Sequence, residues 1–453
     1  MHAEPVPGDK VLAPQPQPAA IRRAAAAIRR FTAAAGAQAT RLGWPLVDQA
    51  IVSIGTFGLT VALARTLAPE EYGTFALLLG GLMVLHMVTA SLVFYPLSIR
   101  HAPAAETEGA ALLHASLALL AAVALPAMAA MAVGLVLAGR ADLILPAWAY
   151  FALWQAQEVF RRALFARLRF AAAIPGDSVS YLGQVAVVLA LAQAGRLSLA
   201  TALLAMAATS GLAALHQAVA AGFLRRGRDP KNPGHSLAAV ARDFWDLGRW
   251  SLANNVLAIM RVQLLLWGLA SFAGAATAAY LQAGLNLVNL MNPLVIGLCN
   301  IIPQTAALAH AGGKAAAWRA ARPFALAGAP VAVLFFLVLV LVPELLLTLV
   351  YGADSPYRDL TLPVRLLALW ALTNYTTDMI CSYFHGVEAA RLALVVNAMG
   401  AAATLAAAVP LVAGFGLVGA CLALCLAGIA RFALAQGLLG RLIAEDGGES
   451  RRA

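Results

Sequence analysis

Long apolar segments, separated by short polar connections, run through most of this sequence. Twelve of them are long enough to cross a hydrocarbon core about 30 Å thick as α-helices. The pattern predicts an all-α integral membrane protein with about twelve transmembrane helices. The predicted spans are 44–65, 73–98, 110–138, 143–160, 171–194, 197–223, 250–272, 277–304, 323–349, 363–385, 391–412 and 416–439.

Composition and charge agree with this class. Hydrophobic residues make up 62% of the chain and charged residues 11%, which excludes a soluble globular protein. Most of the 31 Lys and Arg residues lie in the two tails and in every second connection. Cytoplasmic loops carry such an excess, so both termini are expected in the cytoplasm. The net charge of +10 is therefore a signal of topology, and no nucleic-acid partner is expected.

The longest cytoplasmic connection divides the spans six and six. Trp44 to Gln49 aligns without gaps on Trp250 to Asn255, which indicates a parallel pseudo-repeat with a central cavity between the halves. The proline-rich start is followed by an Ala/Arg helix suited to anionic membrane lipids. The predicted organisation is a basic cytoplasmic tail with an amphipathic helix (1–43), a six-helix bundle (44–224), a cytoplasmic linker (225–248), a second bundle (249–440) and a cytoplasmic tail (441–453).

The turn between the first two spans carries a specific motif. Residues Ala64 to Gly73, ARTLAPEEYG, resemble the corresponding turn of bacterial polysaccharide-export flippases, the translocases of O-antigen or exopolysaccharide repeat units. These flippases belong to the multidrug/oligosaccharidyl-lipid/polysaccharide superfamily. Weaker similarities are Pro96 and Pro303 at helix ends and the segment from Gly386 to Arg391. This chain departs from the family in having only twelve spans and few intramembrane charges.

The resemblance implies a fold and a function. Family members place two six-helix bundles around a central cavity and move undecaprenyl-diphosphate-linked oligosaccharides to the periplasmic leaflet. It therefore implies a multi-pass protein of the bacterial inner membrane that binds a lipid-linked oligosaccharide and moves it by alternating access. A polysaccharide polymerase and glycosyltransferases of the same pathway are implied as partners, and a monomer is expected.

Arg261 is the sharpest candidate for binding this substrate. It lies about 18 Å along a helix from Arg249, near the bilayer centre. A cation there costs about 2.5–3.5 kcal/mol and normally faces a protein interior or a wet cavity. We predict that Arg261 attracts the diphosphate. The alternative is a structural ion pair with Asp378, which is also mid-membrane and is a candidate for proton or sodium coupling.

Amide side chains make the seventh and eighth spans polar. Gln282, Asn286 and Asn289 recur at i, i+4 and i+7, on one helical face. They predict a cavity wall that bonds sugar hydroxyls, and the alternative is amide bonding between helices. The predicted substrate-binding set comprises Arg261, Asn254, Asn255, Gln282, Asn286, Asn289 and, in the family-like turn, Arg65.

Three further acidic positions have simpler interpretations. Asp48 is interpreted as an interfacial or helix N-terminal charge, with ion coupling as the alternative. Glu158 has i,i+3 and i,i+4 spacing to Arg161 and Arg162, which is typical of a surface salt-bridge cluster at a helix end. Asp177 follows a Pro-Gly pair and indicates either a helix break facing a cavity or a late helix start.

Nothing in the sequence indicates catalysis. GxSxG, HExxH, P-loop and CxxC motifs are absent, and the four cysteines have no metal spacing, so no cofactor or metal is expected. The main alternative function is a cation-coupled antiporter of the multidrug and toxin extrusion type, which should favour an acidic cavity. A major-facilitator transporter and a membrane scaffold without transport activity are less favoured by the sequence.

Overall fold

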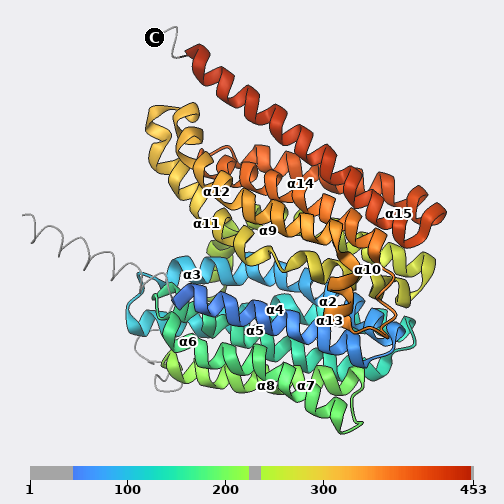
Figure 1. The fold of residues 1–453 in the computed structure, drawn as a ribbon. Helices are drawn as coiled ribbons and strands as arrows, with labels where there is room; N and C mark the ends of the chain where they lie inside the picture. Colours follow the sequence, from blue (N-terminus) through green and yellow to red (C-terminus); the bar gives the residue numbers. More distant parts are fainter. Residues whose placement is uncertain (1–43, 224–235, 450–453) are drawn as a thin grey trace, which may run out of the picture. The chain divides into compact units, whose positions relative to one another are not determined.

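The computed structural model describes residues 44–223 and 236–449, apart from the side chains of Thr107, Arg261 and residues 445–449. The regular elements in these ranges are all helices, which confirms the predicted class (Figure 1). The chain divides into two units, Met1–Val47 and Asp48–Ala453. The predicted basic tail and residues 225–235 of the predicted linker lie outside the described residues.

The N-terminal half begins with a helix from Trp44 to Thr66. Two π-helical turns, η1 and η3, each join shorter helices into one span. The other elements of this half are α2 (Pro69–Thr89), η1 (Ala90–Phe94), α3 (Tyr95–His101), α4 (Glu106–Leu137), the 3-10 turn η2 (Ala141–Leu143), α5 (Ile144–Ala166), α6 (Phe170–Asp177), η3 (Ser178–Leu182), α7 (Gly183–Gln193) and α8 (Leu199–Ala220).

The C-terminal half begins at Ser236, whose side chain accepts a hydrogen bond from the backbone N–H of Ala239 and caps the next helix. The predicted linker therefore ends in helix, and the predicted C-terminal tail also begins in helix. The elements are α9 (Leu237–Ala273), α10 (Ala275–Asn289), α11 (Asn292–Ala309), the 3-10 turn η5 (His310–Gly312), α12 (Lys314–Leu341), α13 (Pro343–Tyr351), α14 (Thr361–Gly386) and α15 (Ala390–Glu449).

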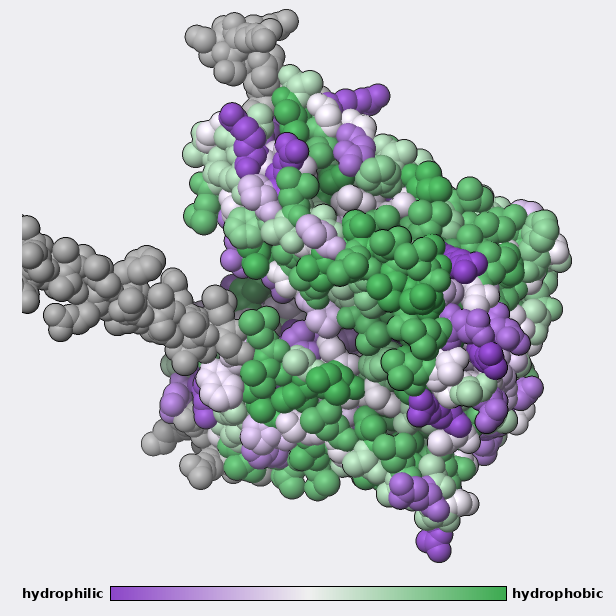
Figure 2. All heavy atoms as spheres, in the orientation of Figure 1, coloured by the Kyte–Doolittle hydropathy of each residue, from purple (hydrophilic) through white to green (hydrophobic). Residues whose placement is uncertain are grey.

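The helices account for the twelve predicted spans. Within the described residues, nine helices are long and apolar enough to cross a membrane. One of these is α15, which a break at Gly416 with a φ of 54° divides into two spans. Helices α5 and α14 are long enough and less apolar, because they carry the polar side chains described below. Hydrophobic side chains cover much of the face seen in Figure 2, as lipid contact requires.

Helix α2 connects the two halves. It packs against both α9 and α10, and the η1 turn that follows it also packs against α9, whereas the most extensive contacts, such as those of α5 with α8 and of α14 with α15, stay within one half. Glycine permits the closest approaches along this junction. A Cβ on Gly73 would lie 1.8 Å from the carbonyl oxygen of Ala275, and one on Gly248 would lie 2.3 Å from that of Ser91. The two halves therefore meet backbone to backbone along α2.

Candidate functional site

A buried arginine organises the polar interior of the N-terminal half. The Nε of Arg161, on α5, donates to Asp177 at 3.0 Å, and its two terminal nitrogens donate to Glu158 at 3.0 Å and to Asp48 at 2.6 Å. All four side chains are at most 8% exposed. One guanidinium therefore ties the first helix to α5 and α6.

Amide and hydroxyl groups complete this N-half cluster. Gln157 and Gln217 both donate to Asp177 Oδ1, at 3.1 and 3.0 Å, and Gln217 brings in α8. Arg162, which is 37% exposed, donates to the second oxygen of Glu158 at 3.2 Å. Three carboxylates thus face two guanidiniums. When all five groups are ionised, the cluster carries one negative charge that no described cation balances.

The sequence-based interpretation of these residues was wrong about their surroundings. Glu158 and Arg161 do not form a surface cluster, because both are buried inside the half, and Asp48 is buried there with them. Asp177 lies at neither a helix break nor a late start, since α6 continues through η3 into α7. The i,i+3 spacing identified the contact between Glu158 and Arg161. It could not reveal the distant partners that make burial possible.

A second buried arginine occupies the C-terminal half. Arg431, on the second part of α15, is 2% exposed. Its terminal nitrogens donate to Asn374 at 2.5 Å, to Asp378 at 3.2 Å and to Asn397 at 2.8 Å. Asn397 in turn donates to Asn254 Oδ1 at 3.1 Å. The C-half cluster therefore joins α9, α14 and both parts of α15.

The two clusters occupy equivalent helices of the two halves. In the N-terminal half the contributing spans are the first, fourth, fifth and sixth, and in the C-terminal half they are the seventh, tenth, eleventh and twelfth. Asp48 and Asn254, which the sequence alignment had paired, hold equivalent positions. The arginine lies on the fourth helix of one half and on the sixth helix of the other. The geometry thus supports the predicted pseudo-repeat.

The structure pairs Asp378 with a cation that the sequence-based alternative did not name. Asp378 forms an ion pair with Arg431, whereas the side chain of Arg261 lies outside the described part of the chain. The predicted pairing of Arg261 with Asp378 therefore has a competitor. The sequence contained a signal for it, because Arg431 is a lone cation inside the last apolar span.

The predicted amides lie at the junction of the halves. Asn255, on α9, donates to Ser91 of η1 at 3.1 Å. Gln282 donates to Asn286 at 2.9 Å, and Asn286 donates to the hydroxyl of Tyr72 on α2 at 2.8 Å. Amide bonding between helices is therefore present at Asn255 and Asn286. Asn289 is exposed at the end of α10.

Arg65 also bridges the halves, although through backbone groups. Its Nε donates to the carbonyl oxygen of Val350 at 2.6 Å, and a terminal nitrogen donates to that of Leu349 at 2.9 Å. These carbonyls lie at the C-terminal end of α13, where a cation is favourable. The structure thus shows Arg65 capping a helix.

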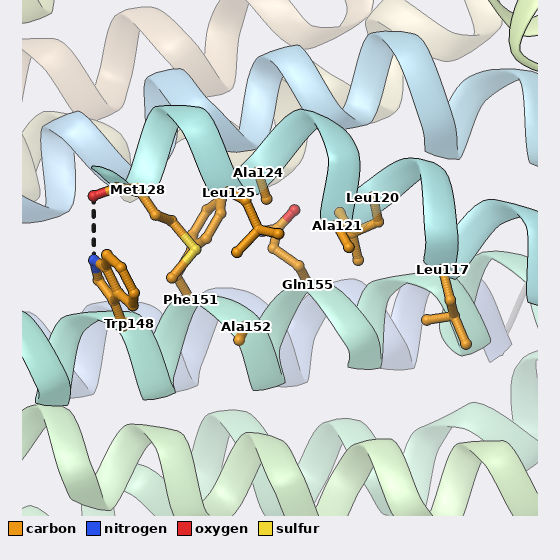
Figure 3. A pocket seen from close by; sticks show the side chains of 10 residues that line it. All are labelled: Leu117, Leu120, Ala121, Ala124, Leu125, Met128, Trp148, Phe151, Ala152 and Gln155. Atoms are coloured by element: carbon orange, nitrogen blue, oxygen red, sulfur yellow. Dashed lines mark hydrogen bonds between the residues drawn. The ribbon is translucent and has the colours of Figure 1, made fainter. Parts of the chain in front are cut away.

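An apolar groove of about 330 Å³ lies between α4 and α5 (Figure 3). Leu125 and Met128 line one wall, and Trp148 on the other donates to the Met128 carbonyl at 3.2 Å. Gln155, which also lines the groove, uses its amide to bind Thr89 and His86 of α2. None of the predicted site residues lines this groove.

Solved transporter structures share this fold. An inward-facing multidrug resistance MATE family transporter of the MOP superfamily is 12% identical, with a TM-score of 0.64, covering 88% of this chain and 98% of that one. The lipid II flippase MurJ, in an inward closed conformation, is 11% identical, with a TM-score of 0.69, covering 87% of each chain. A MOP superfamily transporter from Pyrococcus furiosus is 16% identical, with a TM-score of 0.56, covering 89% and 95%.

These likenesses concern the fold. No family model matches the sequence, and no curated protein sequence matches it. At such identities, the structural likeness establishes the fold, which is that of MOP superfamily transporters, with two bundles of transmembrane helices. The resemblance to this superfamily expected from the ARTLAPEEYG turn is therefore confirmed at the level of the fold. The similar structures are transporters and flippases, not enzymes.

Proposed function

We propose that the protein is a flippase that moves an undecaprenyl-diphosphate-linked oligosaccharide from the cytoplasmic to the periplasmic leaflet of a bacterial inner membrane. Alternating access of the two halves about the α2 junction would carry the headgroup across. The proposal places both termini in the cytoplasm and takes the chain to act as a monomer. In this proposal, glycosyltransferases make the substrate, and a polysaccharide polymerase uses the transported product. The shared fold with the lipid II flippase supports it.

The polar character of α9 is the observation that carries this proposal. This helix contacts α2 of one half and α15 of the other. Asn254 and Asn255 bond in these two directions, and Arg261 lies seven residues after Asn254, two turns along the same side of the helix. A helix at the junction that combines amides with a cation suits sugar hydroxyls and a diphosphate. Gln282, Asn286, Asn289 and Arg65 extend the proposed substrate-binding set.

Substitution of Arg261 tests the role of the diphosphate. Arg261→Ala should abolish surface polysaccharide in a strain that depends on this protein, while immunoblots show normal membrane abundance. Arg249→Ala is the matched control, because Arg249 lies on the same helix with an exposed side chain paired to Asp246. Normal polysaccharide export by the Arg261→Ala variant would remove Arg261 from the site.

The N-half cluster favours a second candidate function, a cation-coupled antiporter of the multidrug extrusion type. Its three buried carboxylates and two guanidiniums leave one negative charge for a proton or another cation. We assign the proposed ion coupling to Asp48 and Asp378, the carboxylates bonded to Arg161 and Arg431. Under this second function, Asp48→Asn would abolish uptake of an organic cation driven by a proton gradient, and under the flippase proposal there is no such uptake to lose.

A further inference from the structure

The C-half cluster has a fixed direction of hydrogen bonding. Arg431 has only donors, so each group that it contacts must accept. Asn397 meets the guanidinium with its carbonyl oxygen at 2.8 Å, which turns its amide nitrogen toward Asn254. Rotating the Asn397 amide by half a turn would place NH₂ against the guanidinium. Arg431 therefore determines the orientation of Asn397.

The same reasoning extends to Asn254 on α9. Its Oδ1 accepts from Asn397 at 3.1 Å, so its own Nδ2 points away from the cluster. Among the described residues, this Nδ2 has no hydrogen-bond partner, and the Asn254 side chain is partly exposed. A chain of three side chains thus begins with a buried cation and ends with a free donor on the helix between the halves.

We infer that Arg431 is a positioning residue, which acts through Asn397 to present the Asn254 amide as a donor to an anionic phosphate oxygen of the transported lipid. This inference rests on the proposed flippase function. It adds a second group to the proposed Arg261 contact, since the two positions lie on the same side of α9. A phosphate accepts from both, and hydrogen bonds to charged groups are the stronger ones.

Asn397→Asp should reverse the direction of hydrogen bonding between positions 397 and 254 while keeping the contact with Arg431. The new carboxylate accepts from Arg431 and, beside Asp378, becomes the second carboxylate at this guanidinium. It cannot donate, and it should turn Asn254 around so that Nδ2 points into the cluster. Asn374→Asp is the matched control. It introduces the same charge at the same guanidinium, and no described hydrogen bond leads from Asn374 to α9.

Binding of undecaprenyl diphosphate, compared with undecaprenol, tests the inference by native mass spectrometry on the purified full-length protein. We expect Asn397→Asp to weaken binding of the diphosphate about tenfold or more, and Asn374→Asp to weaken it less than about threefold. The two variants should unfold at about the same temperature, because each adds one carboxylate at the same guanidinium. Asn254→Leu, which removes the final donor, should match Asn397→Asp.

The outcomes separate the inference from the proposed function. Equal loss in Asn397→Asp and Asn374→Asp would show an effect of charge alone and overturn the inference, as would unchanged binding by Asn397→Asp. An unsubstituted protein that binds undecaprenol as tightly as undecaprenyl diphosphate would instead overturn the proposed function, together with the ligand assigned to Asn254.

Discussion

Removing Arg161 should destabilise the protein severely, because it leaves three buried carboxylates without their shared counter-ion. Arg161→Met keeps most of the side-chain volume and removes three hydrogen bonds, of 2.6 to 3.0 Å, to Asp48, Glu158 and Asp177. Breaking a buried ion pair by deleting one partner costs about 3–5 kcal/mol. With three partners lost, the cost should reach the upper part of that range.

Arg162→Met is the matched control for this prediction. Arg162 pairs with the same carboxylate, Glu158, at 3.2 Å, although it is 37% exposed. An ion pair exposed to this degree contributes about 0–1 kcal/mol. Thermal unfolding in detergent, followed by tryptophan fluorescence, should therefore show a large loss of melting temperature for Arg161→Met and a small one for Arg162→Met.

Adding Asp177→Asn to Arg161→Met should recover part of the loss. This second change removes a carboxylate that has just lost its partner, so the effects of the two substitutions should not add. If Arg161→Met melts at the same temperature as the unsubstituted protein, or at no lower a temperature than Arg162→Met, the N-half cluster does not stabilise the fold as a buried ion-pair network.

Three other predictions test the junction and the topology. Gly73→Val should lower the melting temperature, because its Cβ would lie 1.8 Å from the Ala275 carbonyl oxygen and overpacking costs about 1–3 kcal/mol. Gly81→Ala, whose Cβ would have no neighbouring atom within 4 Å, should leave the melting temperature unchanged. Equal melting temperatures for the two variants would contradict the close contact. Asn286→Leu should destabilise by about 1–3 kcal/mol, since it leaves the buried Tyr72 hydroxyl without its partner, and an unchanged melting curve would count against this bond. In intact cells, a membrane-impermeant thiol reagent should label Ser355→Cys and should not label Gly312→Cys. The reverse labelling would contradict the predicted topology.

The spans could be predicted from sequence because each depends on a local property. Length and hydropathy decide whether a segment can cross the membrane, and even the division of α15 at Gly416 falls where two predicted spans meet. The boundaries shifted mainly where a helix continues into polar sequence. Polar residues between Leu237 and Arg249 read as a loop, although Ser236 caps a helix that begins there.

The polar clusters could not be predicted in the same way. Asp48 and Arg161 are separated by 113 residues, and Asp378 and Arg431 by 53. Burial of a charge depends on which partners the tertiary fold brings to it, and local spacing along the sequence does not identify partners so far apart. The sequence marks the amide positions as polar and does not show what they contact. Their hydrogen-bond directions became clear only with Tyr72, Ser91 and Asn397 in place.

The most direct test of the proposed transport is a translocation assay in liposomes that contain the purified protein. A fluorescent undecaprenyl-diphosphate-linked saccharide is placed initially in the leaflet that corresponds to the cytoplasmic one, and it should move to the opposite leaflet. Membrane-impermeant dithionite, present only on the side of that opposite leaflet, then quenches the fluorescence of the molecules that have moved. Ethidium, an organic cation, should not be transported in the same vesicles. Gradient-driven movement of ethidium without movement of the saccharide would contradict the flippase and favour the extrusion antiporter.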